Sequence, residues 1–354
     1  MGTPEFAVPV LEAVAERVAK PVLVVSQPDR PKGRGRGTVE PTPVKACATR
    51  LGLPLCQPAR IKTPEFAEEL ARHAPDLVVV AAYGRILTEK LLAAPRLGCV
   101  NVHASLLPAY RGAAPINWAI INGETRTGVT VQKMAAALDA GVVLHVKETG
   151  IGPDETAGDL YGRLSALGAE AIVEFFEKAR FGIETRPQDE AGVSFAPPLS
   201  KSDGLVDWSK PARAIHNLVR GTSPWPGAQA KLGGVAVKIH RSRLQIPNPK
   251  SQEKIAKTPG QKPQRTQRAQ RCSKTLMNFS LRSPRSLRLM GFARGSQVPN
   301  CLPGEVVSVG RDCITVATGE GVIDLLEIQA EGARRLAAAD FARGRRIVPG
   351  VRFG

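Results

Sequence analysis

Short apolar runs alternate with helix-patterned stretches through the first half of the chain. Continuous runs of apolar and β-branched residues predict buried strands at 21–26, 77–82, 99–103, 128–132 and 142–146. Helical patterning predicts helices at 64–73, 88–94 and 156–180, with Thr63 and Thr88 as N-caps of the first two. Strands that alternate with helices are typical of βαβ units. The pattern therefore predicts an α/β fold with a Rossmann-like, open, mostly parallel sheet over residues 1–184.

The pattern changes after residue 184. Residues 185–203 are rich in turn-forming residues and predict a linker. Short strands separated by turns follow at 236–239, 304–309, 313–317 and 321–326, and they predict a small OB-like β-barrel within a second domain over 204–354. Residues 246–302 sustain no helix or strand period, so we expect a disordered insertion there.

Composition narrows the class of protein. Hydrophobic residues make up 43% and charged residues 23% of the 354 positions, as in an ordinary globular chain. No apolar run approaches the ~20 residues of a membrane helix, and no secretory signal is apparent. The expected location is the cytoplasm, with an organelle matrix as the alternative. Six scattered cysteines without a CxxC pair predict reduced thiols and no metal site.

The chain is strongly basic, with a formal net charge of +17. Residues 246–302 contain 12 Lys or Arg residues and one acidic residue, Glu253, and thus carry +11 of that total. A polyanionic partner is consistent with this charge, but net charge alone is a weak argument for one.

The pattern Asn101-Val-His103 supplies the first candidate chemistry. Two residues apart on a predicted strand, Asn101 and His103 project from one face near its carboxyl end, where open α/β sheets place ligands. An amide donor beside an imidazole can stabilise an oxyanion and handle a proton. The alternative is a histidine whose hydrogen bonds are satisfied within the fold, and spacing alone does not decide between them.

Asp139 is the second candidate. It lies in the segment Leu-Asp-Ala-Gly that ends at Gly141, after the predicted strand 128–132. An Asp beside a Gly is typical of a turn or a helix cap, so the residue by itself favours a structural role.

A basic loop is the third candidate for a functional role. Residues 29–37, DRPKGRGRG, interleave arginines with glycines and begin no helix, which excludes a dinucleotide-binding motif. A cationic loop of this kind suits contact with phosphates or base edges. A solvated surface loop is the alternative.

Several segments together resemble the methionyl-tRNA formyltransferases. They are the sequences at 2–7 (GTPEFA), 27–31 (QPDRP), 82–87 (AYGRIL), 98–103 (GCVNVH), 105–108 (SLLP), 111–116 (RGAAPI) and 138–141 (LDAG), with 207–208 (DW), 224–226 (PWP) and 348–350 (VPG) in the second domain. The resemblance spans nearly the whole chain apart from the insertion. It implies transfer of the formyl group of 10-formyltetrahydrofolate to the methionine amine of charged initiator tRNA, without a metal.

The resemblance also implies roles for particular residues. Asn101, His103 and Asp139 match the catalytic trio: the first two stabilise a tetrahedral oxyanion, and Asp139 orients His103 or a water and assists proton transfer. The folate is expected along two loops, at Tyr83, Gly84, Ile86, Leu87, Ser105, Leu106, Leu107 and Pro108.

The tRNA is expected to meet the basic loop and the second domain. Arg34 matches a base-contacting arginine, while Arg30, Lys32 and Arg36 would contact the backbone. Lys238 is a candidate on the barrel, with an ordinary solvated face as the alternative. We expect a monomer.

Two departures from the family pattern keep alternatives open. The family carries a short apolar strand before the segment at 2–4, and this sequence starts without it, which predicts either a start placed too late or a damaged protein. The insertion at 246–302 could add nonspecific tRNA affinity or be passive. The competing functions are a folate-dependent formyltransferase or hydrolase acting on a small molecule, and a catalytically impaired RNA-binding relative.

Overall fold

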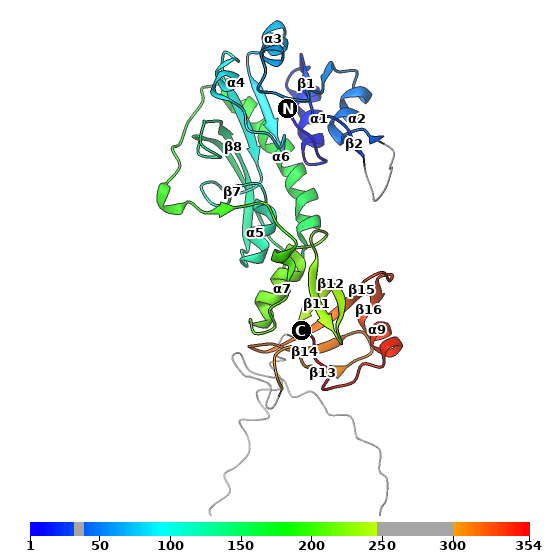
Figure 1. The fold of residues 1–354 in the computed structure, drawn as a ribbon. Helices are drawn as coiled ribbons and strands as arrows, with labels where there is room; N and C mark the ends of the chain where they lie inside the picture. Colours follow the sequence, from blue (N-terminus) through cyan, green and yellow to red (C-terminus); the bar gives the residue numbers. More distant parts are fainter. Residues whose placement is uncertain (32–38, 246–300) are drawn as a thin grey trace, which may run out of the picture.

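The chain folds into an α/β body followed by a β-rich body (Figure 1). The structure is a computed structural model and describes residues 1–31, 39–245 and 301–354. The expected α/β class is confirmed. In the first body the elements are α1 (Ala7–Arg17), β1 (Val24–Val25), β2 (Arg30–Pro31), β3 (Val39–Glu40), α2 (Pro43–Arg50), β4 (Leu55–Cys56), α3 (Pro64–Arg72), β5 (Val78–Ala81), α4 (Glu89–Ala93), β6 (Cys99–His103), β7 (Arg111–Gly112), α5 (Pro115–Ile121), β8 (Arg126–Lys133), β9 (Val143–Gly150) and α6 (Ala157–Ala179).

The main sheet of this body runs in the order β5-β6-β8-β9. β5 and β6 are parallel, whereas β8 pairs antiparallel with both β6 and β9. The short connection between β8 and β9 explains the antiparallel pairing of those two strands, because a parallel crossover needs a dozen or more residues. β6 and β8 are joined through α5, so the length of their connection does not fix their relative direction. The apolar pattern had located these strands, but it carries no information on their direction.

Threonine side chains begin the helices where the sequence indicates. The hydroxyl oxygens of Thr63 and Thr88 accept the backbone N–H groups three residues on and cap α3 and α4. Thr156 and Asp159 form a reciprocal capping box at the start of α6. One face of α6, including Leu160, Leu164 and Ile172, is buried against α1 and the sheet. Each such side chain stabilises the fold by about 1.5–3 kcal/mol through burial.

The start of the chain lies between two strands that do not pair directly. The Met1 amine donates to the Val79 carbonyl at 2.6 Å, and Gly2 N–H donates to the Val25 carbonyl at 3.0 Å. Beyond them an apolar cleft of about 370 Å³ separates residues 22–25 from residues 77–79. β1 pairs with β4. Gly2 links β1 to the main sheet, because it bonds to Val25 of β1 and forms a bridge to Ala81 of β5.

The second body begins after a strap that we define as residues 185–200. The strap contains β10 (Phe195–Ala196). The elements of the second body are α7 (Ala212–Gly221), β11 (Ala228–Leu232), β12 (Val235–Leu244), β13 (Val306–Val309), β14 (Ile314–Ala317), β15 (Val322–Ala330), β16 (Leu336–Ala337) and α9 (Ala338–Arg345). Five strands form an antiparallel sheet in the order β11-β12-β15-β14-β13, and β16 adds to β15. The predicted insertion lies outside the described residues except for Cys301 and Leu302.

The two bodies meet at α7. This helix packs against α5, and the Asn117 side-chain amide donates to the Gly221 carbonyl at 2.8 Å. Arg220 is buried and donates to the carbonyls of Gly152 and Glu155, just before α6. These hydrogen bonds hold the second body against the first.

Candidate active site

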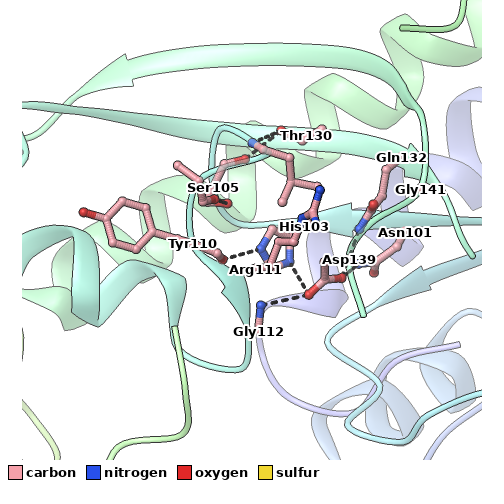
Figure 2. A network of polar contacts seen from close by, with 12 residues as sticks. Asn101, His103, Ser105, Tyr110, Arg111, Gly112, Thr130, Gln132, Asp139 and Gly141 are labelled. Carbon is pink, nitrogen blue, oxygen red and sulfur yellow. Dashed lines mark hydrogen bonds and ion pairs between the residues drawn. The ribbon is translucent and has the colours of Figure 1, made fainter. Parts of the chain in front are cut away.

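Asn101 and His103 lie on β6 and project from the same side of the sheet (Figure 2). Their register partners on β8 are Gln132 and Thr130. Alternation along two antiparallel strands thus places four polar side chains next to one another near the carboxyl end of β6. Asp139 reaches this cluster from the loop after β8, so the structure brings the three sequence candidates together.

The Asp139 carboxylate is the centre of the cluster. Its Oδ1 accepts from Asn101 Nδ2 at 3.4 Å and from Gln132 Nε2 at 3.0 Å. Its Oδ2 accepts from the backbone N–H of Gly112 at 3.0 Å and lies 3.7 Å from His103 Nδ1. Gln132 is 1% exposed, so its amide has no competing bulk water and must find its partner inside the protein.

His103 is held on both sides. Its Nε2 lies 3.0 Å from the Tyr110 carbonyl, and Nδ1 faces Asp139. Because a carbonyl only accepts, the contact with Tyr110 requires the proton of Nε2, and Nδ1 is the ring nitrogen that faces the Asp139 carboxylate. Tyr110 is in turn anchored by its hydroxyl, which donates to Glu124 at 2.7 Å, and burial raises its pKa to about 12.

The backbone at Asp139 is unusual for a residue with a side chain. Its φ is +49°, in the left-handed region. Two residues on, a Cβ at Gly141 would lie 1.6 Å from the Lys133 carbonyl, so the loop folds back tightly on the end of β8. This turn aims the carboxylate back at β6.

Residues 105–108 form a shaped loop beside His103. Thr130 Oγ1 donates to the Ser105 carbonyl at 2.7 Å and accepts the Leu107 N–H at 3.1 Å, and Ser105 Oγ donates to the Ala109 carbonyl at 2.6 Å. Ser105 and Leu107 are buried, while Leu106 and Pro108 are half-buried. The loop is therefore rigid where it borders the cluster.

The second predicted folate segment follows β5. The side chains of Tyr83 and Leu87 are buried in the core, whereas Gly84 and Ile86 are exposed. The Tyr83 carbonyl accepts from Gln27 and Thr3, and burial raises the pKa of its phenol. Any ligand on this segment would meet its backbone and Ile86 rather than the Tyr83 ring.

The predicted tRNA residues are partly described. Arg30 is exposed on β2 and donates to Gln27 at 2.8 Å; β2 and β3 form an antiparallel stem on either side of residues 32–38. Lys32, Arg34 and Arg36 lie outside the described residues. Lys238 is exposed on β12 and donates to the Pro226 carbonyl at 3.3 Å.

Sequence reasoning missed three side chains of the site. They are Gln132 on β8, Arg111 on β7 and Gln188 on the strap. Gln188 Oε1 accepts from Arg111 Nε and Nη2 at 3.0 and 2.8 Å, and its Nε2 donates to the carbonyls of Asp139 and Gly141. The two-residue period of β8 could have indicated Gln132, because that period puts its side chain on the same face as Thr130.

Among residues 1–31, 39–245 and 301–354, no group of three or more His, Cys, Asp or Glu side chains could hold a metal ion. Across the same residues, no helix is long and apolar enough to cross a membrane.

Two family models match the chain. One, described as "Formyl transferase", matches residues 1–176, and the other, "Formyl transferase, C-terminal domain", matches residues 198–346. A protein named methionyl-tRNA formyltransferase from Geobacter metallireducens is 42% identical over 355 aligned positions, covering all of this chain and 97% of that protein. The protein of that name from Myxococcus xanthus is also 42% identical, covering 99% of this chain and 95% of its own length.

Solved structures support the fold at low identity. An N-formyltransferase from Helicobacter canadensis in complex with folinic acid and dTDP-3-aminofucose matches with a TM-score of 0.56 at 16% identity, over 92% of this chain and 97% of that one. HypX from Aquifex aeolicus in complex with tetrahydrofolic acid gives 0.51 at 17% identity, over 83% of this chain and 43% of its own.

Proposed function

Because this chain belongs to the methionyl-tRNA formyltransferase family and so formylates the methionine carried by initiator tRNA, we propose that Asn101, His103 and Asp139 form its reaction centre. The observation that carries the proposal is the Asp139 carboxylate, which contacts both the half-buried Asn101 and the buried His103. The family membership gives the reaction, and this cluster gives the groups that would perform it.

The formyl donor we assign is 10-formyltetrahydrofolate. The family acts by formyl transfer, and two solved structures of the same fold were determined with folates bound. We place the folate along residues 83–87 and 105–108, with the rigid loop at Ser105 and Leu107 nearest the cluster. The exposed side chain of Ile86 and the half-buried side chain of Leu106 offer apolar surface for a pteridine ring.

The reaction is an acyl transfer between two nitrogens. The uncharged amine of methionine attacks the formyl carbon, a new C–N bond forms and the carbonyl becomes an oxyanion. Asn101 Nδ2 carries two hydrogens, one of which is directed at Asp139, and the other serves the oxyanion. A protonated His103 adds positive charge beside it.

Asp139 holds the charge and the proton path together. Its Oδ2 faces His103 Nδ1, so it stabilises the doubly protonated ring while the oxyanion forms. When the intermediate collapses, the bond from the formyl carbon to the folate nitrogen breaks. The proton lost by the amine passes by way of the His103–Asp139 pair or a water to that nitrogen, which balances the reaction.

For the tRNA we propose the basic loop at Arg30, Lys32, Arg34 and Arg36, together with Lys238 on β12. Their charge suits the phosphate backbone of an acceptor stem. Arg34→Ala is expected to raise KM for charged tRNA about tenfold and to flatten its salt dependence. Arg96→Ala, which removes an exposed guanidinium paired with Asp76, is the matched control.

We propose that the protein acts as a monomer in the cytoplasm, where its bacterial relatives would meet initiator tRNA.

The test of the reaction centre is a formylation assay with charged initiator tRNA and 10-formyltetrahydrofolate. Asp139→Asn should lower kcat by roughly 10²–10⁴-fold, and Asn101→Ala should also act mainly on kcat. Asp76→Asn, which changes an exposed carboxylate paired with Arg96 and in no contact with Asn101, His103 or Asp139, should leave the rate unchanged. Formylation of a small amine but not of charged tRNA would contradict the substrate, and full activity of Asp139→Asn would contradict the reaction centre.

A further inference from the structure

The strap passes directly over the Asp139 loop on its way to the second body. After α6 the chain runs back along the first body past β7 and on to α7 (Figure 1). Arg186 pairs with Val143 through two backbone hydrogen bonds of 2.8 and 2.9 Å, and β10 pairs in parallel with β7. A segment that the sequence presents as a linker is thus tied down at both ends.

Gln188 is a half-buried residue within an exposed part of the strap. Residues 181–187 and 189–192 are all exposed, and Gln188 between them is half-buried. A polar side chain that leaves solvent in an otherwise exposed segment has to be compensated by hydrogen bonds. The contacts of Gln188 supply that compensation, and they all lie around Asp139.

Both ends of the Gln188 amide are used. Nε2 donates to the Asp139 carbonyl at 2.8 Å and to the Gly141 carbonyl at 2.7 Å. Oε1 accepts two hydrogen bonds from the buried Arg111, whose neighbour Gly112 donates its N–H to Asp139 Oδ2. Gln188 therefore links the backbone of the Asp139 loop to the strand that binds the Asp139 carboxylate.

We propose that Gln188 is a positioning residue for the reaction, one that holds Asp139 in its left-handed backbone conformation. At φ +49° the conformation costs free energy for a residue with a Cβ, so it persists only where its surroundings impose it. The two donors of Gln188 grip the carbonyl of Asp139 and that of Gly141, on either side of Ala140. With that grip, the carboxylate stays aimed at Asn101 and His103.

The proposal rests on the proposed reaction centre and adds a link between the two bodies. Because Gln188 belongs to the strap, the geometry of Asp139 depends on a segment that continues into the tRNA-binding half. Gln188 is neutral, so it acts on the Asp139 loop through directed hydrogen bonds and not through charge.

The test compares three variants of the full chain in the formylation assay. Gln188→Ala removes the grip, and Gln188→Glu keeps the shape and the acceptor for Arg111 but loses both donors. We expect each to lower kcat by roughly 10–100-fold with little change in KM for tRNA or folate. Asp189→Ala, the next residue on the strap and exposed, should keep the parent kcat.

A double-mutant cycle separates positioning from folding. If Gln188 acts through Asp139, then Gln188→Ala should add little loss in the Asp139→Asn background. Equal loss in both backgrounds, or a rise in KM alone, overturns the proposal, and so does parent activity of Gln188→Glu. Should Asp139→Asn itself keep full activity, the reaction centre fails first, which distinguishes the two failures. Thermal unfolding of Gln188→Glu, near the parent Tm, shows that the fold is intact.

Discussion

Gln132 donates its side-chain amide to Oδ1 of Asp139 at 3.0 Å from a position directly across the sheet from Asn101. Gln132 is 1% exposed, and Asn101 approaches the same oxygen at 3.4 Å. Two amides on neighbouring strands thus share one carboxylate oxygen, which leaves Oδ2 for His103 and Gly112 (Figure 2). The carboxylate is oriented by strands on one side and by a loop on the other.

Gln132→Glu tests the orientation of Asp139 by charge. It places a second carboxyl group against Asp139 in a buried site, and two carboxylates about 3 Å apart do not both ionise. We expect kcat to fall by at least about tenfold and the acid limb of the pH–rate profile to move to higher pH. Formylation rates between pH 5 and 9 measure both effects. Gln229→Glu, on β11 of the second body, is the control, and an unchanged pH profile for Gln132→Glu would contradict the orientation we describe.

Gly141→Ala tests the tight turn after Asp139. A Cβ there would lie 1.6 Å from the Lys133 carbonyl, so the loop has to shift and carry the carboxylate away from His103. We expect kcat to fall by on the order of 10²-fold, because ångström displacements of reacting groups have costs of that size. Gly162→Ala in α6 is the matched control: nothing lies within 4 Å of its Cβ, and we expect up to about 1 kcal/mol of added stability with unchanged activity. Parent activity in Gly141→Ala would show that the loop tolerates displacement.

Arg220→Met tests the junction between the two bodies. Burial lowers the pKa of this arginine, and its guanidinium donates to the carbonyls of Gly152 and Glu155 and to Asn217. Methionine fills most of the volume but leaves these acceptors without a donor, which should reduce the free energy of unfolding by roughly 1–3 kcal/mol. Urea denaturation measures the loss. Arg213→Met, exposed on the same helix, should change it by less than about 0.5 kcal/mol.

The sequence named part of the candidate site and could not name the rest. A two-residue spacing on a predicted strand put Asn101 and His103 on one face, and the resemblance supplied the proposed roles of both residues and of Asp139. Gln132 remained unnoticed because a glutamine inside a strand has an ordinary role on a solvated face, and its partner is set by register across the sheet. Gln188 was beyond reach: its importance depends on the path of residues 185–200 over β7, a long-range packing result that local pattern does not encode.

The fold, like the candidate site, could be predicted from the sequence only in part. The apolar runs located β5, β6 and β8, whose residues are mostly buried, and the run at 142–146 located the start of β9, where half-buried residues give way to alternation with exposed ones. The run at 21–26 predicted a full strand, yet only Val24–Val25 pairs in β1, because strand length depends on the neighbour that is present and not on the run itself. The antiparallel direction of β9 relative to β8 follows from their short connection, whereas the apolar pattern does not indicate the direction of β8 relative to β6.

The strap also changes where this protein divides into exchangeable parts. By composition, a boundary at residue 184 separates a catalytic module from the remainder, and the first family model already ends at residue 176. By contact, Gln188 and Ala196 belong to the catalytic module, because one binds the Asp139 loop and the other pairs with Gly112. A chimera of two relatives joined at residue 184 combines the Asp139 loop of one parent with the Gln188 segment of the other. A junction placed after Pro198 takes the Asp139 loop and Gln188 from the same parent, so enzymes recombined there should retain turnover more often.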